Sequence, residues 1–215
     1  GSGVAKFDGN NWSYYPAADY GLGNNVVSIG EDRNGKMYFS TNNGVVVFDG
    51  NNWSKLTWPG QNTHVTEIFV DSKKNVWFAS DGFYKFDGSA WTHFSTDNGA
   101  IFTDDITEDI FGNIWFGGGK KLVKYDGNTF TEYTSNDGLA AATAANIFAL
   151  HADKNGDIWV GTYFGGISKL EQLPDPCPQH FHTVWEGTSG VDHMNINVIG
   201  AKYDGLDLET GDEVG

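Results

Sequence analysis

The chain has 215 residues and carries 28 acidic against 13 basic side chains, a formal net charge of −15. Because affinity for nucleic acids comes from neutralising phosphates, this balance argues against DNA or RNA as a partner. No apolar stretch reaches the length of a membrane-spanning helix, and with Cys177 as the single cysteine no internal disulfide can form.

Taken in order, the chain shows short runs of β-branched and aromatic residues separated by Asp, Asn and Gly. Residues 3–7 and 12–15 predict two strands, and units of up to four strands follow over 26–56, 65–94, 103–133 and 147–170. The last of these units has no obvious fourth strand. Either residues 12–15 supply that strand and close a ring, or the natural protein extends beyond this N-terminus.

Four markers repeat through these units at a period of about 40 residues. They are an Asp at a turn, an aromatic residue after it, an Asp-Gly hairpin and an apolar residue before the turn. The turn Asp stands at Asp32, Asp71, Asp109 and Asp153, and the aromatic at Tyr38, Trp77, Trp115 and Trp159. An all-β repeat of this size predicts the blade of a β-propeller, with the repeated aromatics packed between blades.

These markers resemble the two-component-regulator propeller repeat, found in extracytoplasmic sensor regions and secreted proteins of the Bacteroidetes type. The resemblance covers roughly residues 1–173 and rests on the stretch from Gly21-Leu22 to Asp49-Gly50 and on Gly138-Leu139 through Gly161. Lys74 stands where the repeat has a turn Gly. The resemblance implies a propeller with four to five blades visible, which is either a whole ring or a fragment of a larger one.

After the repeats, residues 174–180 are rich in proline and predict a linker. Residues 181–215 alternate apolar and polar side chains and are too few to fold alone. This segment resembles the opening of a β-sandwich module, so we expect a propeller over 1–173, the linker, and a partial C-terminal β segment.

Loops that enter the first strand of each blade converge at the central mouth of a propeller, where ligands of ring-shaped folds are often bound. Amides, one imidazole and carboxylates there have the groups needed to hydrogen-bond a sugar. The predicted ligand-binding residues at this mouth are Asn25, His64, Glu67, Asp104, Asp105 and Asn146. The alternative interpretation is that these residues only line a water-filled channel.

Aromatic side chains outside the repeating register are candidates for stacking on sugar rings, because sugars bind to flat apolar faces. Trp58, Tyr20, Tyr163 and Phe164 have this pattern. Each of them is also suited to covering the edge of a blade.

Metal binding and catalysis are the alternatives. The turn 153–157 offers oxygen ligands at alternate positions, as calcium loops do, but Phe164 stands where the bidentate Glu belongs. We therefore expect no cofactor, with calcium as the alternative.

Residues 112–116 are similar to strands of streptogramin lyases. This resemblance implies an alternative function as a lyase, either of the streptogramin type or acting on polysaccharide. Its centre would be a metal at the mouth, with His64 beside Glu67 or Asp105.

We therefore expect an extracellular, cell-surface or periplasmic propeller that is not an enzyme. Its expected partner is a polysaccharide or another protein.

Overall fold

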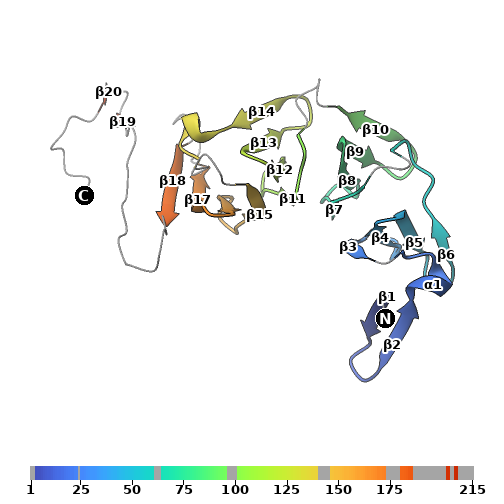
Figure 1. Ribbon diagram of the computed structural model, residues 1–215. Helices are drawn as coiled ribbons and strands as arrows, with labels where there is room; N and C mark the ends of the chain where they lie inside the picture. The colour runs from blue at the N-terminus through green and yellow to red at the C-terminus, as the bar shows by residue number, and fades with distance from the viewer. Residues whose placement is uncertain are drawn as a thin grey trace.

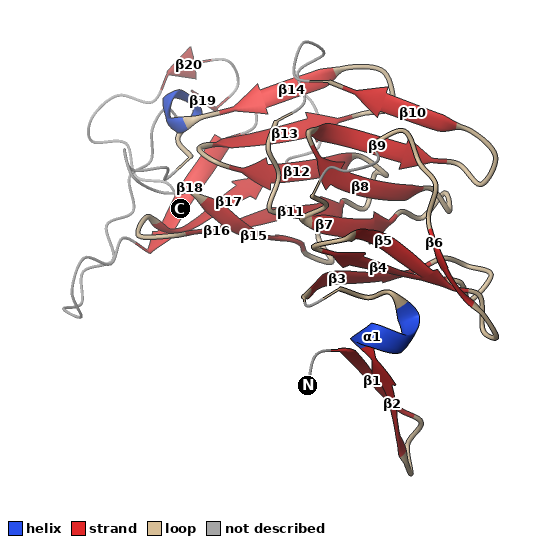
Figure 2. Ribbon diagram, turned by 45° about the vertical axis from the view of Figure 1, so that its right-hand side comes forward, coloured by secondary structure: helices blue, strands red, loops and turns tan. Residues whose placement is uncertain are grey.

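A computed structural model describes residues 3–23, 25–60, 64–95, 101–139 and 146–172, together with the backbone of 180–185, 202–203 and 206–207. The described chain is almost entirely antiparallel β-structure. Four four-stranded sheets follow one another along an arc, with their first strands on its inner side (Figure 1). Turned to the side, the sheets are stacked face to face, with the N-terminal hairpin at one end (Figure 2). This is the blade arrangement of a propeller.

Each blade is formed by consecutive strands in the order in which they occur along the chain. The first is β3 (Val26–Glu31), β4 (Met37–Thr41), β5 (Gly44–Phe48) and β6 (Trp53–Lys55); the second is β7 (Glu67–Val70), β8 (Val76–Ser80), β9 (Gly82–Phe86) and β10 (Trp91–Phe94); the third is β11 (Asp105–Glu108), β12 (Ile114–Gly118), β13 (Lys121–Tyr125) and β14 (Phe130–Tyr133); the fourth is β15 (Ile147–Ala152), β16 (Ile158–Thr162), β17 (Gly166–Glu171) and β18 (His180–Trp185). The remaining elements are the β1 (Gly3–Phe7) and β2 (Trp12–Pro16) hairpin, α1 (Ala17–Tyr20), η2 (Ser135–Asp137), β19 (Lys202–Tyr203) and β20 (Leu206–Asp207).

The fourth strand of the fourth blade differs from one sequence-based expectation. It is β18, which pairs with β17 from Ile167 opposite Trp185 to Glu171 opposite His180. Residues 12–15 lie in β2, which pairs only with β1. The chain therefore supplies this strand from beyond its proline-rich segment, because a strand with an unpaired edge is completed by whichever extended segment reaches it. Most of the predicted linker and C-terminal segment lies outside the described residues.

Three of the four repeated aromatic residues pack between blades, as predicted, whereas Trp159 of the fourth blade is half-buried and lies in none of the described core clusters. Tyr38 of the first blade lies in one buried cluster with Phe78 of the second. Trp77 of the second blade lies in the next cluster with Phe116 of the third, and Trp115 of the third in a cluster of fourth-blade residues. Each blade thus buries one face against its successor, so the stability of the array is shared along a line of neighbours.

A hydrogen bond from an indole to a carboxylate recurs at the predicted turn Asp. Nε1 of Trp77, Trp115 and Trp159 donates to Oδ2 of Asp71, Asp109 and Asp153, at 2.8, 2.8 and 2.9 Å. In the first blade the hydroxyl of Tyr38 donates to Asp32 at 3.2 Å. The other carboxylate oxygen accepts backbone N–H groups of the same turn, so one Asp holds both the turn and the aromatic ring.

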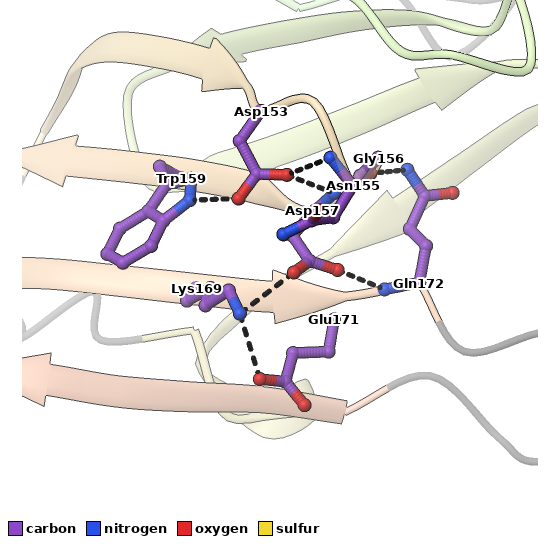
Figure 3. Close-up of polar contacts among 8 residues, drawn as sticks. All are labelled: Asp153, Asn155, Gly156, Asp157, Trp159, Lys169, Glu171 and Gln172. Atoms are coloured by element: carbon purple, nitrogen blue, oxygen red, sulfur yellow. Dashed lines mark hydrogen bonds and ion pairs between the residues drawn. The ribbon is translucent and has the colours of Figure 1, made fainter.

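The fourth blade adds a network of charged and polar groups to this bond (Figure 3). Nζ of Lys169 lies 2.8 Å from Oδ2 of Asp157 and 2.9 Å from Oε1 of Glu171. The Gln172 amide donates to the Gly156 carbonyl at 2.7 Å and to Asp109 of the third blade at 3.0 Å. Because Gln172 is buried, its amide links the turns of two neighbouring blades.

We expect Trp115→Phe to lower the free energy of unfolding by about 1–3 kcal/mol, because it removes the N–H that satisfies a buried carboxylate. Chemical denaturation of both proteins measures the difference. Trp12→Phe is the control, since Trp12 is 72% exposed on the N-terminal hairpin. An equal change in the two variants would show that the indole–carboxylate bond does not stabilise the blade.

Candidate functional site

Three of the predicted binding residues lie on one rim of the arc, where the chain enters an inner strand. Asn25, His64 and Asn146 precede β3, β7 and β15 respectively. Their carbonyls accept hydrogen bonds from the turn between the second and third strands of the same blade. The donors are the Asn42 N–H, the Ser80 hydroxyl and the Tyr163 N–H, at 3.3, 2.8 and 2.7 Å. We call these entry segments and turns the upper rim.

Just inside the upper rim, the residue four positions before the turn Asp connects neighbouring blades in two places. Ser28 Oγ on β3 accepts from the Ile68 N–H of β7 at 3.0 Å. Asp105 Oδ2 on β11 accepts from the Leu150 N–H of β15 at 2.6 Å. Glu67 holds this position on β7 and hydrogen-bonds with the Ser28 hydroxyl of the first blade. The other oxygen of Asp105 accepts the Ile106 N–H at 2.8 Å. The predicted residues Glu67 and Asp105 thus lie at equivalent positions on the inner strands of the second and third blades.

Burial and neighbouring negative charge disfavour the ionised forms of Glu67 and Asp105. Burial, together with the neighbouring Asp105 and against the opposing effect of the Ser28 hydroxyl, raises the pKa of Glu67 to about 7. Burial also raises the pKa of Asp105, although the N–H groups of Leu150 and Ile106 act in the opposite direction. Both carboxyl groups are partly buried and therefore hold a proton more readily than exposed ones do.

Two of the four predicted stacking residues are packed inside the protein. Trp58 is 3% exposed, and its ring lies 4.8 Å from that of Tyr84 and 5.6 Å from that of Phe78. The expectation that Trp58 is an exposed aromatic is therefore wrong, because the connection after β6 passes over the seam between two blades and buries its ring there. Tyr20 is half-buried against Trp53, at 5.1 Å.

The other two stacking residues are exposed on the upper rim, as expected. Tyr163 is 57% and Phe164 73% exposed, and their ring centroids lie 4.0 Å apart. Phe148, 53% exposed, completes the group at 5.6 Å from Tyr163. We call Phe148, Tyr163 and Phe164 the aromatic platform. The sequence analysis missed Phe148, because a register shift between Ile147 and Ala149 breaks the strand alternation that would have assigned its face.

The backbone of Phe164, one of the three residues of the aromatic platform, is in a strained conformation. Phe164 has φ 66°, in the left-handed region that bulky residues avoid. Strained residues of this kind cluster at binding sites, where the rest of the structure compensates for the strain. The platform borders a hollow of about 410 Å³, lined also by Ala149, Thr162 and Ile167.

The alternative of a lyase placed its centre at His64 beside Glu67 or Asp105. Within the described residues, no hydrogen bond joins the exposed His64 to Glu67 or Asp105. In the same part of the chain, no three His, Cys, Asp or Glu side chains are grouped closely enough to hold a metal ion.

At the calcium-like turn, the carboxylate oxygens already have partners. Asp153 accepts from the N–H groups of Asn155 and Asp157 and from the Trp159 indole. Asp157 accepts the Gln172 N–H and pairs with Lys169. A calcium ion bound at this turn would have to displace these bonds.

We expect the stability of the protein to depend on pH through Glu67. A carboxyl group with a raised pKa binds its proton more tightly when folded, so its contribution is present below the unfolded value of 4.5 and is lost as the pH rises to about 7. Glu67→Gln should remove this loss and stabilise the protein above that pH by roughly 1 kcal/mol, allowing for solvent screening.

Thermal unfolding across the same pH range, with Glu132→Gln on the exposed part of β14 as control, measures the effect. A parallel pH profile for wild type and Glu67→Gln would contradict the assignment.

Comparison with known proteins identifies the repeat. The model of the two-component regulator propeller matches residues 20–43 and 143–164, which contain the first and fourth of the predicted turn aspartates. Among curated proteins, none matches the chain's sequence.

The fold is shared with solved propellers. The extracellular domain of a putative hybrid two-component system from B. thetaiotaomicron superposes with a TM-score of 0.67 at 22% identity, over 77% of this chain and 25% of that one. Virginiamycin B lyase from Staphylococcus aureus gives 0.61 at 19%, over 77% and 58%. PorZ, a surface component of the type-IX secretion system of Porphyromonas gingivalis, gives 0.56 at 20%, over 79% and 29%.

The chain thus spans about a quarter of the sensor domain and less than two thirds of the lyase, and similarity at this level of identity establishes the fold alone. No helix in the described residues is long and apolar enough to cross a membrane. The matched repeats, the four blades and these neighbours agree: the chain is a β-propeller that carries repeats of the two-component regulator type at residues 20–43 and 143–164.

Proposed function

We propose that the chain is an extracytoplasmic recognition module that binds a carbohydrate chain on its upper rim. The observation that carries this proposal is the aromatic platform, where the ring of Tyr163 contacts those of Phe148 and Phe164 and all three rings are more than half exposed. Exposed apolar groups that are clustered, rather than scattered singly, mark binding surfaces. Flat aromatic faces suit the apolar faces of sugar rings.

Polar groups on the same rim are suited to sugar hydroxyls. The entry residues Asn25, His64 and Asn146 leave their side chains exposed, since the contacts that fix these segments use their backbone carbonyls. Ligand sites usually combine an apolar surface with a few polar groups. Here the aromatic platform would stack on the sugar ring, and the neighbouring amides would hydrogen-bond the sugar's hydroxyl groups. The extracellular domains among the structural neighbours support a location outside the cytoplasm.

A binding role is favoured over the lyase alternative. The virginiamycin B lyase shares the fold, and that alone does not transfer an activity. The expected catalytic pair, His64 with Glu67 or Asp105, is not joined in this structure, whereas the aromatic platform is already assembled. A propeller that recognises its ligand needs a rigid surface of this kind and no reacting group.

We expect Phe164→Gly to weaken glycan binding at least about tenfold while leaving the melting temperature unchanged or higher. The substitution removes the most exposed ring of the platform and at the same time relieves the left-handed backbone, which glycine adopts freely. Binding to a panel of oligosaccharides, followed by calorimetry on each hit, measures the change in affinity.

Trp12→Ala is the matched control, because it removes an equally exposed ring from the hairpin at the other end of the arc. Unchanged affinity in Phe164→Gly and Tyr163→Ala would refute the platform as the site. A panel without any hit would refute carbohydrate recognition and leave a protein as the partner to be sought.

A further inference from the structure

The third and fourth blades carry a glycine at the same position of their second strands. Gly117 of β12 and Gly161 of β16 follow the repeated tryptophan at the same distance along the chain. A β-carbon built on Gly117 would lie 2.6 Å from the Cγ2 methyl group of Ile147 and 3.0 Å from the methyl groups of Leu150. Because both of these residues belong to the inner strand of the fourth blade, the bare backbone of Gly117 gives room to aliphatic groups of the next blade.

Gly161 offers the same room on the far face of the fourth blade. A β-carbon built there would meet, among the residues that the structure describes, only Ala149 of its own sheet, 3.4 Å away at the nearest. Gly161, Ala149 and the partly exposed Ile167 line the hollow of about 410 Å³ beside the aromatic platform. The hollow thus lies on the face turned away from the third blade, at the repeat position that accepts methyl groups on Gly117.

The lining of this hollow offers little to a polar or charged group. None of the described residues that form it carries a formal charge. Among its hydroxyl groups, that of Thr162 donates to the Gly166 carbonyl at 3.0 Å, and that of Tyr163 belongs to an exposed ring of the platform. A hydroxyl group placed over Gly161 would therefore give up hydrogen bonds to water without replacing them, whereas a methyl group would gain from its burial.

We propose that the aromatic platform and this hollow together bind a 6-deoxyhexose, a sugar whose ring carries a methyl group in place of the usual hydroxymethyl group. This inference rests on the proposed carbohydrate function and names its ligand class. The rings stack on the apolar face of the sugar, and the methyl group enters the hollow over Gly161. Because Ala149 directly follows Phe148 of the platform, the hollow begins beside the rings, where a group bonded to the stacked sugar reaches it.

Other substituents suit the hollow less well. A uronic acid has a carboxylate on the same carbon, and the net charge of −15 repels it. An ordinary hexose has a hydroxyl group there, which loses its water in an apolar surrounding. An acetyl group carries its methyl on a carbonyl that needs a hydrogen-bond donor of its own. The methyl group of a 6-deoxyhexose buries apolar surface without bringing a polar atom with it.

Two matched pairs of sugars test the inference: L-fucose with L-galactose, and L-rhamnose with L-mannose, each at the end of the same oligosaccharide. Within a pair, the sugars differ only in the methyl or hydroxymethyl group. Calorimetry with the whole chain should show about tenfold tighter binding of the deoxy sugar in at least one pair, the order by which an apolar pocket discriminates one such group.

Gly161→Ala should abolish this preference and leave the melting temperature unchanged, because it places a β-carbon where the sugar's methyl group lies and meets Ala149 at an ordinary contact distance. Ile167→Ser should reduce the preference as well. Val27→Ser is the matched control and should leave it intact, since Val27 is a comparably exposed aliphatic residue, 49% against 41%, on the first blade.

Equal affinity within both pairs, with binding lost in Phe164→Gly, would overturn the methyl preference and leave carbohydrate binding at the platform standing. A preference that survives in Gly161→Ala would place the methyl group elsewhere and overturn the inference too. Binding of none of the four sugars would also overturn it, and the broader oligosaccharide panel would then decide whether carbohydrate recognition itself survives.

Discussion

The bond between an aspartate carboxylate and an aromatic side chain is the constraint on which each blade depends. One oxygen of Asp71, Asp109 or Asp153 accepts backbone N–H groups of the turn, and the other accepts an indole N–H. The indoles of Trp77 and Trp115 are also buried against the next blade. The same carboxylate therefore fixes the turn between two strands and the orientation of the ring on which the neighbouring blade packs.

This arrangement separates the parts of the repeat that are fixed from the parts that vary. The turn aspartates and the buried rings recur from blade to blade, while the upper rim changes: Asn42 and Asn43 in the first blade, Asp81 in the second, Tyr163 and Phe164 in the fourth. A rigid stack can carry such changes because the loops contribute little to the buried interface. Recognition is then a property of one rim of the stack, and the rest of each blade serves to position it.

The repeat architecture could be predicted from the sequence because four independent markers recur together, and each has a clear physical role in the structure. The strand that completes the fourth blade could not, since the pairing of β18 with β17 joins segments whose spacing the repeat does not specify. Trp58 was misassigned because a connection between elements is usually exposed, whereas this one covers a seam.

Within the candidate site, sequence reasoning found Tyr163 and Phe164, where two aromatics stand in a turn that usually holds small residues. It missed Phe148, because a bulge shifts the alternation by one residue and a periodic pattern cannot show where that happens. It also placed Glu67 and Asp105 at the mouth without indicating that Asp105 bonds to the Leu150 N–H of the next blade. That contact depends on the stacking of the sheets, which spacing along the chain does not encode.

The joints between inner strands are chemically unequal, and this affects how cooperatively the stack unfolds. A hydroxyl joins the first blade to the second, and a carboxylate accepting an N–H joins the third to the fourth, whereas the second blade carries at this position Glu67, a partly buried carboxyl group whose pKa burial raises. In a linear array each interface contributes its own coupling energy, so the weakest one sets where the array divides. We therefore expect ionisation of Glu67, as the pH rises through about 7, to weaken the array at the second blade first.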